Sequence, residues 1–220
     1  MKTTDTYHHG NLRPELLGAA VSIISEEGLD HLTMRTLSKR VGVSRTALYR
    51  HFTDKSALLC AIAEDGFNKL TSRYREINND TSLQASDRLQ EIGRTYVEFA
   101  IRNPGYYRLM FGHEIMHQKR SAELIRAAKD TFTEFRSTVE AVQREVNVKL
   151  EDPLALANLA WIVVHGLSGL IIDGQIRMSG DILGFPALLE NADTQNNDSI
   201  HQNLHFSRKI LTDFWNILSS

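Results

Sequence analysis

The sequence of 220 residues lacks several features that would narrow the range of folds and functions. Cys60 is its one cysteine, so no intrachain disulfide can form, and a reducing compartment such as the cytoplasm fits best. The N-terminus has no apolar core of the signal-peptide type. No sustained alternation of polar and apolar residues predicts a β-sheet. These absences favour a helical cytoplasmic protein.

The chain also lacks a large net charge, which is −2 at pH 7 and argues against attraction of the whole protein to nucleic acid. The charge is unevenly distributed. Before residue 53, seven Lys and Arg residues stand against five Asp and Glu, whereas the remainder has 18 against 22. A cationic first part on a nearly neutral chain is typical of a DNA-binding domain attached to a body with another task.

Apolar residues at helical spacing, separated by turn residues, predict an all-α fold. The first helix runs from about Leu12 to Glu27, between a cap at Asn11 and a stop at Gly28. Polar loops are expected at 78–82 and 191–199. Further helices are expected after the caps Thr33 and Ser44, from Thr53 or Asp54 to near Ile77, from the 78–82 loop to about Arg102, from Tyr106 to about His113, from Ala122 to about Val148, from Pro153, and from about Ile200 to Leu218.

Residues 33–59 contain the most informative pattern in the chain. Two short apolar-faced helices flank Gly42, where the backbone must turn sharply. Arg45, Thr46, Tyr49 and Arg50 point away from the apolar face of the second helix. A short helix that offers arginine, hydroxyl and aromatic side chains suits the major groove of DNA. The pattern therefore predicts a helix-turn-helix. The apolar face consists of Met34, Leu37, Val41, Val43, Ala47 and Leu48.

Several motifs resemble the tetracycline-repressor (TetR) family of bacterial transcription regulators. They are YHHGNLRPELLGAA, GVSRTALYRHFTDKSALL and the GF at 66–67, which together cover residues 7–70. NPGYYRLMFG and WIVVHGLSG, within roughly 95–175, resemble a branch of this family marked by a Trp, His, Gly signature, here Trp161, His165 and Gly166. The resemblance implies an all-helical homodimer that represses transcription and releases its operator when a small molecule binds.

The resemblance also divides the chain into domains. It implies a flexible arm over 1–10, a helix-turn-helix DNA-binding domain over 11–53 and a helical ligand-binding and dimerisation domain over 54–220. The arm, with its histidines, is expected either to brush the DNA or to have no fixed structure.

Seven residues are expected to contact double-stranded operator DNA. Ser44 caps its helix or reaches a phosphate, and Arg45 reads guanine or neutralises a phosphate. Tyr49 matches a family position that touches the DNA backbone, with packing in the protein core as its alternative. Lys55 begins a helix, where a cation is unfavourable with respect to the helix dipole, so its presence suggests an external phosphate. The full set is Thr33 (or a plain N-cap), Ser44, Arg45, Thr46, Tyr49, His51 and Lys55.

The family places an inducer pocket among the helices of the body. His165, at helical spacing from Trp161, is the best polar candidate, although a lone histidine on an apolar face also fits a satisfied core residue. Aromatic residues at helical spacing equally fit an ordinary core, and no cofactor is expected. The candidate lining consists of Tyr96, Phe99, Tyr107, Phe111, Phe135, Trp161 and His165.

The segment 154–172 is nearly long enough to span a membrane. Asn158 and His165 within it, acidic flanks and the lack of a basic cluster argue against that interpretation. A helix that is apolar on nearly every side is instead expected to be buried by its own domain and a second subunit. Dimerisation is therefore expected through the last two long helices, where Gly166, Gly169 and Gly174 would allow close approach.

Two rival interpretations remain open at the level of sequence. Residues 113–117 spell H-E-x-x-H, the zinc-protease signature, but lack its longer extension, so no enzyme is expected. His113 and His117, joined by His201 or His205, would instead suit a metal-sensing regulator. The second rival is a structural DNA-binding protein without ligand control, which hardly needs an aromatic-rich helical body.

Overall fold

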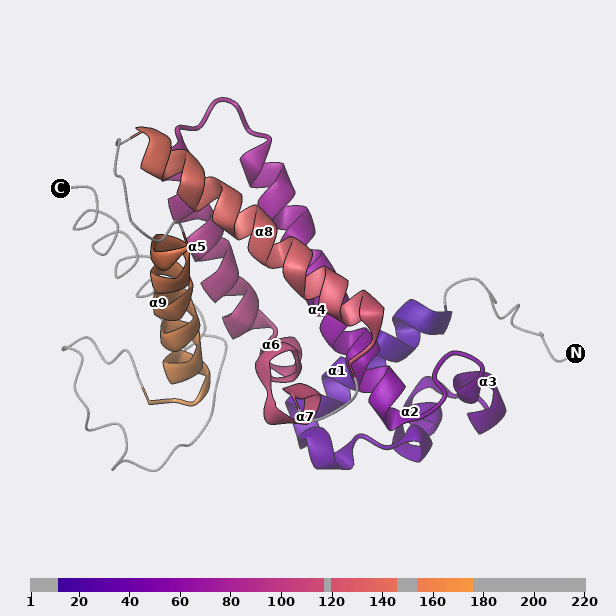
Figure 1. The fold of residues 1–220 in the computed structure, drawn as a ribbon. Coiled ribbons are helices and arrows are strands. Elements are labelled where there is room, and N and C mark those ends of the chain that lie inside the picture. Colours follow the sequence, from indigo (N-terminus) through magenta and orange to yellow (C-terminus); the bar gives the residue numbers. More distant parts are fainter. Residues whose placement is uncertain (1–11, 117–119, 146–153, 176–220) are drawn as a thin grey trace, which may run out of the picture. The chain divides into compact units, whose positions relative to one another are not determined.

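The computed structural model describes residues 12–116, 120–145 and 154–175, and these ranges are helical without a strand (Figure 1). The all-α fold class is therefore confirmed. The predicted arm, the loop at 191–199 and the helix at 200–218 lie outside the described residues. The helices are α1 (Leu12–Glu27), the 3-10 turn η1 (Leu29–His31), α2 (Met34–Val41), α3 (Arg45–Tyr49), α4 (Lys55–Asn78), α5 (Ala85–Arg102), α6 (Pro104–Phe111), α7 (His113–Met116), α8 (Ala122–Glu145) and α9 (Ala155–Ile172).

The chain forms two compact units. The first unit comprises the described residues within Met1–Gly66 and Gly105–Ile125, and the second those within Phe67–Pro104 and Arg126–Ser220. The first therefore contains α1 to α3 and most of α6, and the second contains α5 and α9. The helix α4 contributes its first half to one unit and its second half to the other.

Local hydrogen bonds fix the lengths of α2 and α3. Thr36 N–H donates to the Thr33 hydroxyl at 3.0 Å, and Thr33 N–H donates to Thr36 Oγ1 at 2.8 Å, which closes a capping box. Gly42 ends α2 with a φ of 75°, a left-handed conformation that glycine adopts without strain. Ser44 begins α3 by accepting from Ala47 N–H at 3.1 Å. The predicted caps Thr33 and Ser44 and the glycine turn at Gly42 are confirmed, whereas the predicted cap Asn11 lies outside the described residues.

A leucine-rich core holds these short helices in place. Leu48 is the buried residue of α3, and Phe52, directly after α3, is buried as well. Burying a side chain of this size contributes about 1.5–3 kcal/mol, so α3 is attached to the core mainly through Leu48. The predicted inward residues Val43 and Ala47 are only half-buried. Fully buried partners in the same unit include Leu16, Ile23, Leu32 and Leu37.

The helix α6 packs tightly within the first unit because glycine leaves room for it. A Cβ built on Gly66 would lie 2.5 Å from Met110 Sδ and 3.1 Å from a ring carbon of Tyr106. The Tyr106 hydroxyl donates to Asp65 Oδ2 at 2.5 Å. The pKa of Tyr106 is raised above its ordinary value, mainly by burial and to a lesser extent by this hydrogen bond. The first half of α4 is thereby joined to α6.

The second unit contains two helix pairs with different contacts. The helices α5 and α9 lie side by side (Figure 1). The second half of α4 is instead bonded to α8 through polar groups, with the Thr71 and Thr131 hydroxyls 2.7 Å apart. At the last residue of α4, Asn78, the side-chain Oδ1 accepts a hydrogen bond from the Thr138 hydroxyl of α8 at 2.6 Å. These buried hydroxyls are all satisfied, as burial requires.

Several helix ends differ from the predicted ones for identifiable reasons. Asp54 accepts from Ala57 N–H at 2.8 Å, so it is the cap and α4 begins one residue later. α6 begins at Pro104 rather than Tyr106, because proline is well suited to a first helical position. A bend at Gly112 then separates α6 from α7. The outer ends of α1, Leu12 and Glu27, are as predicted.

Candidate nucleic-acid interface

The outward face of α3 is exposed. Arg45, Thr46 and Arg50 are all exposed, and Tyr49 retains 49% of its accessible surface. A tyrosine that packed into the core would be buried, so the packing alternative for Tyr49 is not what the structure has. Ser44 is exposed beside them while its hydroxyl accepts the capping hydrogen bond. The inward Leu48 thus leaves the side chains of Arg45, Thr46 and Tyr49 exposed to a partner.

Several cations on or next to α2 and α3 are exposed. Arg45 and Arg50 on and after α3, and Arg35 and Lys39 on α2, are exposed. Their side chains make no ion pair or hydrogen bond within the ranges that the structure describes. Arg35 and Lys39 were absent from the predicted contacts. The sequence could have identified them, because both residues lie between the apolar positions of α2 and therefore on its solvent side.

Arg40, the remaining cation of α2, has a structural role. Its guanidinium lies 3.0 Å from Glu26 Oε2 and 2.5 Å from Glu27 Oε1 at the end of α1. These exposed ion pairs contribute little free energy, but they satisfy the charge of Arg40. Among the cations of α2, Arg35 and Lys39 are therefore the ones open to an external anion.

The other predicted DNA contacts are in varied surroundings. Thr33 is exposed, but its hydroxyl already caps α2. His51 is exposed, with its ring 6.4 Å from that of Phe52. Lys55 is half-buried and its Nζ donates to the Leu29 carbonyl at 3.3 Å, so a phosphate would have to share this ammonium group. Contact with DNA stays a prediction for all of them.

The structure brings three of the predicted pocket residues together in the second unit. Tyr96 Oη and His165 Nδ1 share a hydrogen bond at 2.8 Å. The Trp161 ring stacks on the His165 ring, with centroids 5.0 Å apart. Burial lowers the pKa of His165 below its ordinary value, because a low-dielectric environment disfavours the charged imidazole. The cluster thus favours a neutral, oriented histidine.

The other four predicted pocket residues are distributed differently. Phe135 is buried in the second unit against Tyr74, at a ring distance of 6.5 Å, and Phe99 is half-buried there. The rings of Tyr107 and Phe111 are tilted against one another with their centroids 5.3 Å apart, but both residues belong to the first unit. The seven residues therefore do not come from one compact unit, and ligand binding by them stays a prediction.

Comparison with known protein families identifies the family of this chain. Residues 16–62 match the model of bacterial regulatory proteins, tetR family, and residues 89–190 match a tetracyclin repressor-like, C-terminal domain. A protein from Pectobacterium carotovorum, named nucleoid occlusion factor SlmA, is 35% identical over 174 residues, which is 76% of this chain and 86% of that protein. The chain belongs to the TetR family of DNA-binding transcriptional regulators.

Further curated relatives and solved structures match different shares of the chain. The SlmA protein of Haemophilus influenzae is 35% identical over 109 residues, 49% of each chain, so the chain spans about half the length of the first curated relatives that it matches. Among solved structures, a Rhodococcus protein of unknown function is 26% identical with a TM-score of 0.71, covering 99% of this chain and 100% of that one. A TetR-family regulator from Pectobacterium atrosepticum has the same fold, with a TM-score of 0.61, 21% identity and coverage of 93% and 92%.

Membership of the TetR family, which is non-enzymatic, confirms that no enzyme is to be expected. For the rival metal site, no group of three or more His, Cys, Asp or Glu side chains that could hold a metal exists among the described residues. His113 is exposed, whereas His117, His201 and His205 lie outside those residues. The metal-sensing alternative is therefore untested.

The helix α9 of this TetR chain has two contrasting sides. Its length and composition would suffice to cross a membrane, a test that the core helix of a soluble protein also passes. One side is buried, including Val164, Leu167 and Ile171, and α9 packs on α5. On the other side Leu159 and Ile162 are 45% and 59% exposed. Aliphatic side chains gathered on the exposed side of a helix are typical of an interaction surface.

Proposed function

We propose that this TetR-family protein is a ligand-responsive repressor that binds double-stranded operator DNA and leaves it when a small-molecule inducer binds the body. The exposed outer face of α3 carries the proposal, because Arg45, Thr46 and Tyr49 stand free on a helix whose caps and core contacts leave them outside. Residues 11–53 then form the DNA-binding domain behind an arm of residues 1–10, and residues 54–220 form the ligand-binding and dimerisation domain.

A homodimer is part of the proposal. A pseudo-palindromic operator is read by two α3 helices about 34–36 Å apart, or at a multiple of that spacing. Dimerisation through α9 and the helix expected at 200–218 would cover Leu159 and Ile162 with a second copy rather than with lipid. The protein would then work in the cytoplasm.

The inducer is proposed to bind near Trp161 and His165, the positions that resemble the Trp, His, Gly signature with Gly166. The hydrogen bond between Tyr96 and His165 supports this location, because it fixes the orientation of the imidazole ring beside Trp161. A ligand shifts an equilibrium only by its different affinities for the two states. The inducer must therefore fit the released conformation better than the DNA-bound one.

The test begins with selection of genomic fragments bound by the purified full chain, followed by measurement of the neighbouring genes in a deletion strain. A repressor predicts a few strongly enriched fragments and higher expression of the genes beside them. No enrichment, or lower expression of those genes, would contradict repression. Compounds related to the neighbouring genes are then added to the bound fragment, and the expected result is release.

A second candidate function comes from the relatives that are named nucleoid occlusion factors, at 35% identity. The same selection separates the two candidates. A regulator enriches fragments ahead of particular genes. For a nucleoid occlusion factor we expect deletion of the protein to leave the expression of genes beside the enriched fragments unchanged.

A further inference from the structure

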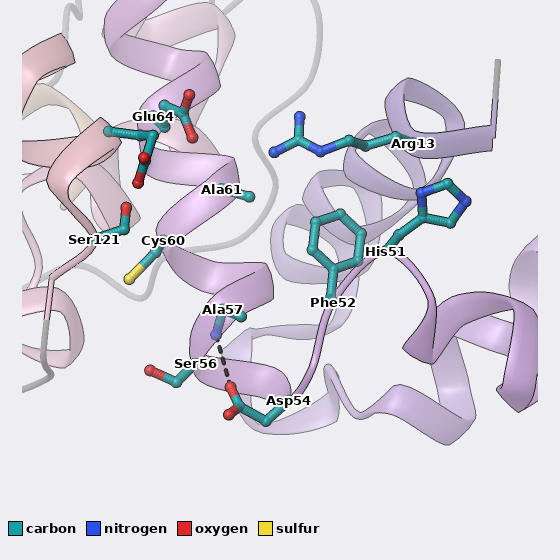
Figure 2. Close-up of a pocket in the computed structure, with 11 residues that line it drawn as sticks. Arg13, His51, Phe52, Asp54, Ser56, Ala57, Cys60, Ala61, Glu64 and Ser121 are labelled. Atoms are coloured by element: carbon teal, nitrogen blue, oxygen red, sulfur yellow. Dashed lines mark hydrogen bonds between the residues drawn. The ribbon is translucent and has the colours of Figure 1, made fainter. Parts of the chain in front are cut away.

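A cavity of about 460 Å³ lies in the first unit, next to the segment that follows α3 (Figure 2). Side chains from α1, from residues 51–54, from the first half of α4 and from the start of α8 line it. Its volume is within the range of about 300–1,000 Å³ that is usual for small-molecule sites. It shares no residue with the aromatic cluster of Tyr96, Trp161 and His165, so it requires its own explanation.

The floor of the cavity is apolar. Phe52, Cys60 and Ala61 are buried, and Ala57 beside them is half-buried. Figure 2 shows the Phe52 ring between Arg13 and the first turn of α4. The Arg13 guanidinium lies over that ring, 5.6 Å from its centroid. This surface suits the apolar body of a ligand, with Phe52 available for ring contacts.

The rim is acidic. Besides the Cys60 thiol, five ionisable side chains line the cavity, namely Arg13, His51, Asp54, Glu64 and Glu123. One Asp54 oxygen is engaged in capping α4. Glu64 and Glu123 make no ion pair or hydrogen bond within the described part of the chain. Three carboxylates thus face one guanidinium and one imidazole, and the excess of negative charge favours a cation.

We propose that this cavity is a binding site for an amphipathic organic cation. Its apolar body rests on Phe52, Cys60 and Ala61, and its ammonium or guanidinium group pairs with Glu64. A bare metal ion is a poor match, because the described residues offer no group of three metal-ligating side chains. An anionic ligand could pair with the Arg13 guanidinium but would be repelled by the three carboxylates.

The site would act on DNA binding directly. Phe52 follows the end of α3 by three residues, and the adjacent His51 is a predicted DNA contact that also lines the cavity. A bound cation would therefore contact residues 51–52, which directly follow α3, and would compete with DNA for His51. This consequence rests on the proposed function, whereas binding of the cation does not.

The experiment uses three probes of nearly equal shape and different charge: 4-phenylbutylammonium, 4-phenylbutanol and 4-phenylbutyrate. Each is titrated into the full chain by isothermal calorimetry at pH 7. The ammonium probe is expected to bind at least tenfold more tightly than the butyrate. Equal binding of the three, or a preference for the butyrate, would overturn the proposal.

Variants then locate the bound probe. Glu64→Gln is expected to weaken binding of the ammonium probe about tenfold, the usual effect of losing a partly buried charged contact, and Ala61→Leu is expected to block binding by filling the cavity. Glu15→Gln, an exposed carboxylate on α1 outside the cavity, is the matched control and should bind normally. Circular dichroism verifies the fold of each variant. Binding that survives both cavity substitutions lies elsewhere and refutes the site.

A separate titration with the selected operator distinguishes this proposal from the proposed function. If the ammonium probe binds through Glu64 and lowers operator affinity in wild type but not in Glu64→Gln, both hold. If the probe binds while the chain selects no operator, the cavity proposal stands and the proposed function fails.

Discussion

The helices α3 and α9 both leave side chains exposed, but with opposite chemistry. On α3 the exposed groups are cationic, hydroxyl and aromatic, led by Arg45 and Tyr49. On α9 they are aliphatic, led by Leu159 and Ile162. Side chains of the first kind suit a polyanion with polar base edges, and those of the second kind suit another apolar surface. We therefore propose a different partner for each helix, namely DNA for α3 and a second copy of the chain for α9.

The two helices are also held differently. Burial of one leucine and a serine cap hold the five residues of α3, whereas α9 buries a whole side of its 18 residues. A short, polar, capped helix can present its side chains to DNA because few of them are needed for the core. A long apolar helix can pair with a second copy without losing its contact with α5.

The largest expected effect comes from placing a charge on the apolar side of α9. In Ile162→Glu, dimerisation would bury an unpaired carboxylate at a cost of several kcal/mol, so the dimer should weaken at least about a hundredfold. Analytical ultracentrifugation measures this change. Ile125→Glu, at an exposed isoleucine of α8, is the control and should stay dimeric. An unchanged dimer in Ile162→Glu would remove α9 from the interface.

The second effect comes from shortening the exposed side chains of α3. Arg45→Ala and Tyr49→Ala should each weaken operator binding by about 1–3 kcal/mol, or roughly fivefold to over a hundredfold. Fluorescence anisotropy with the selected duplex provides the measurement. Melting temperatures should stay close to wild type, because both residues are exposed. Arg102→Ala, an exposed arginine at the end of α5, is the control, and equal affinities in all three variants would argue against α3.

The third effect is on stability and comes from the caps that hold α2 and α3. Thr33→Ala removes the hydroxyl that accepts from Thr36 N–H and should lower the free energy of unfolding by about 1 kcal/mol. Thr33→Ser keeps that acceptor and should lose less. Urea denaturation gives both values. A Thr33→Ala protein as stable as wild type would show that the capping box contributes little.

The smallest effect is the pH dependence of the buried side of α9. The pKa of His165 is lower in the folded protein than its ordinary value of 6.5, so the unfolded chain takes up the proton first as pH falls. The free energy of unfolding should therefore fall from pH 7.5 to 5.5, and by less in His165→Gln. Urea denaturation at several pH values tests this difference, and parallel curves would contradict it.

Local signals in the sequence were sufficient for most of the fold. Gly28 and Gly42 end helices, and Thr33 and Ser44 begin them, because these effects involve residues close in sequence. The outward face of α3 followed from helical periodicity alone. These features depend on backbone geometry and capping rather than on distant contacts.

Features that join distant parts of the chain could not be predicted in this way. The ion pairs of Arg40 with Glu26 and Glu27 depend on how α1 and α2 pack. The cavity beside Phe52 brings Arg13 and Ser121 together, although they are far apart in sequence. Aromatic spacing alone also did not separate the residues of the first unit from those of the second. Only the tertiary arrangement contains this information.

The central claim is that α3 reads DNA, and its most direct test is the affinity of the full chain for the selected operator and for a scrambled duplex across a range of salt concentrations. The account predicts tight binding of the operator alone, with an affinity that falls steeply as salt rises, because exposed cations such as Arg35, Lys39 and Arg50 displace counterions from phosphates. Equal affinity for both duplexes and a flat salt profile would contradict it.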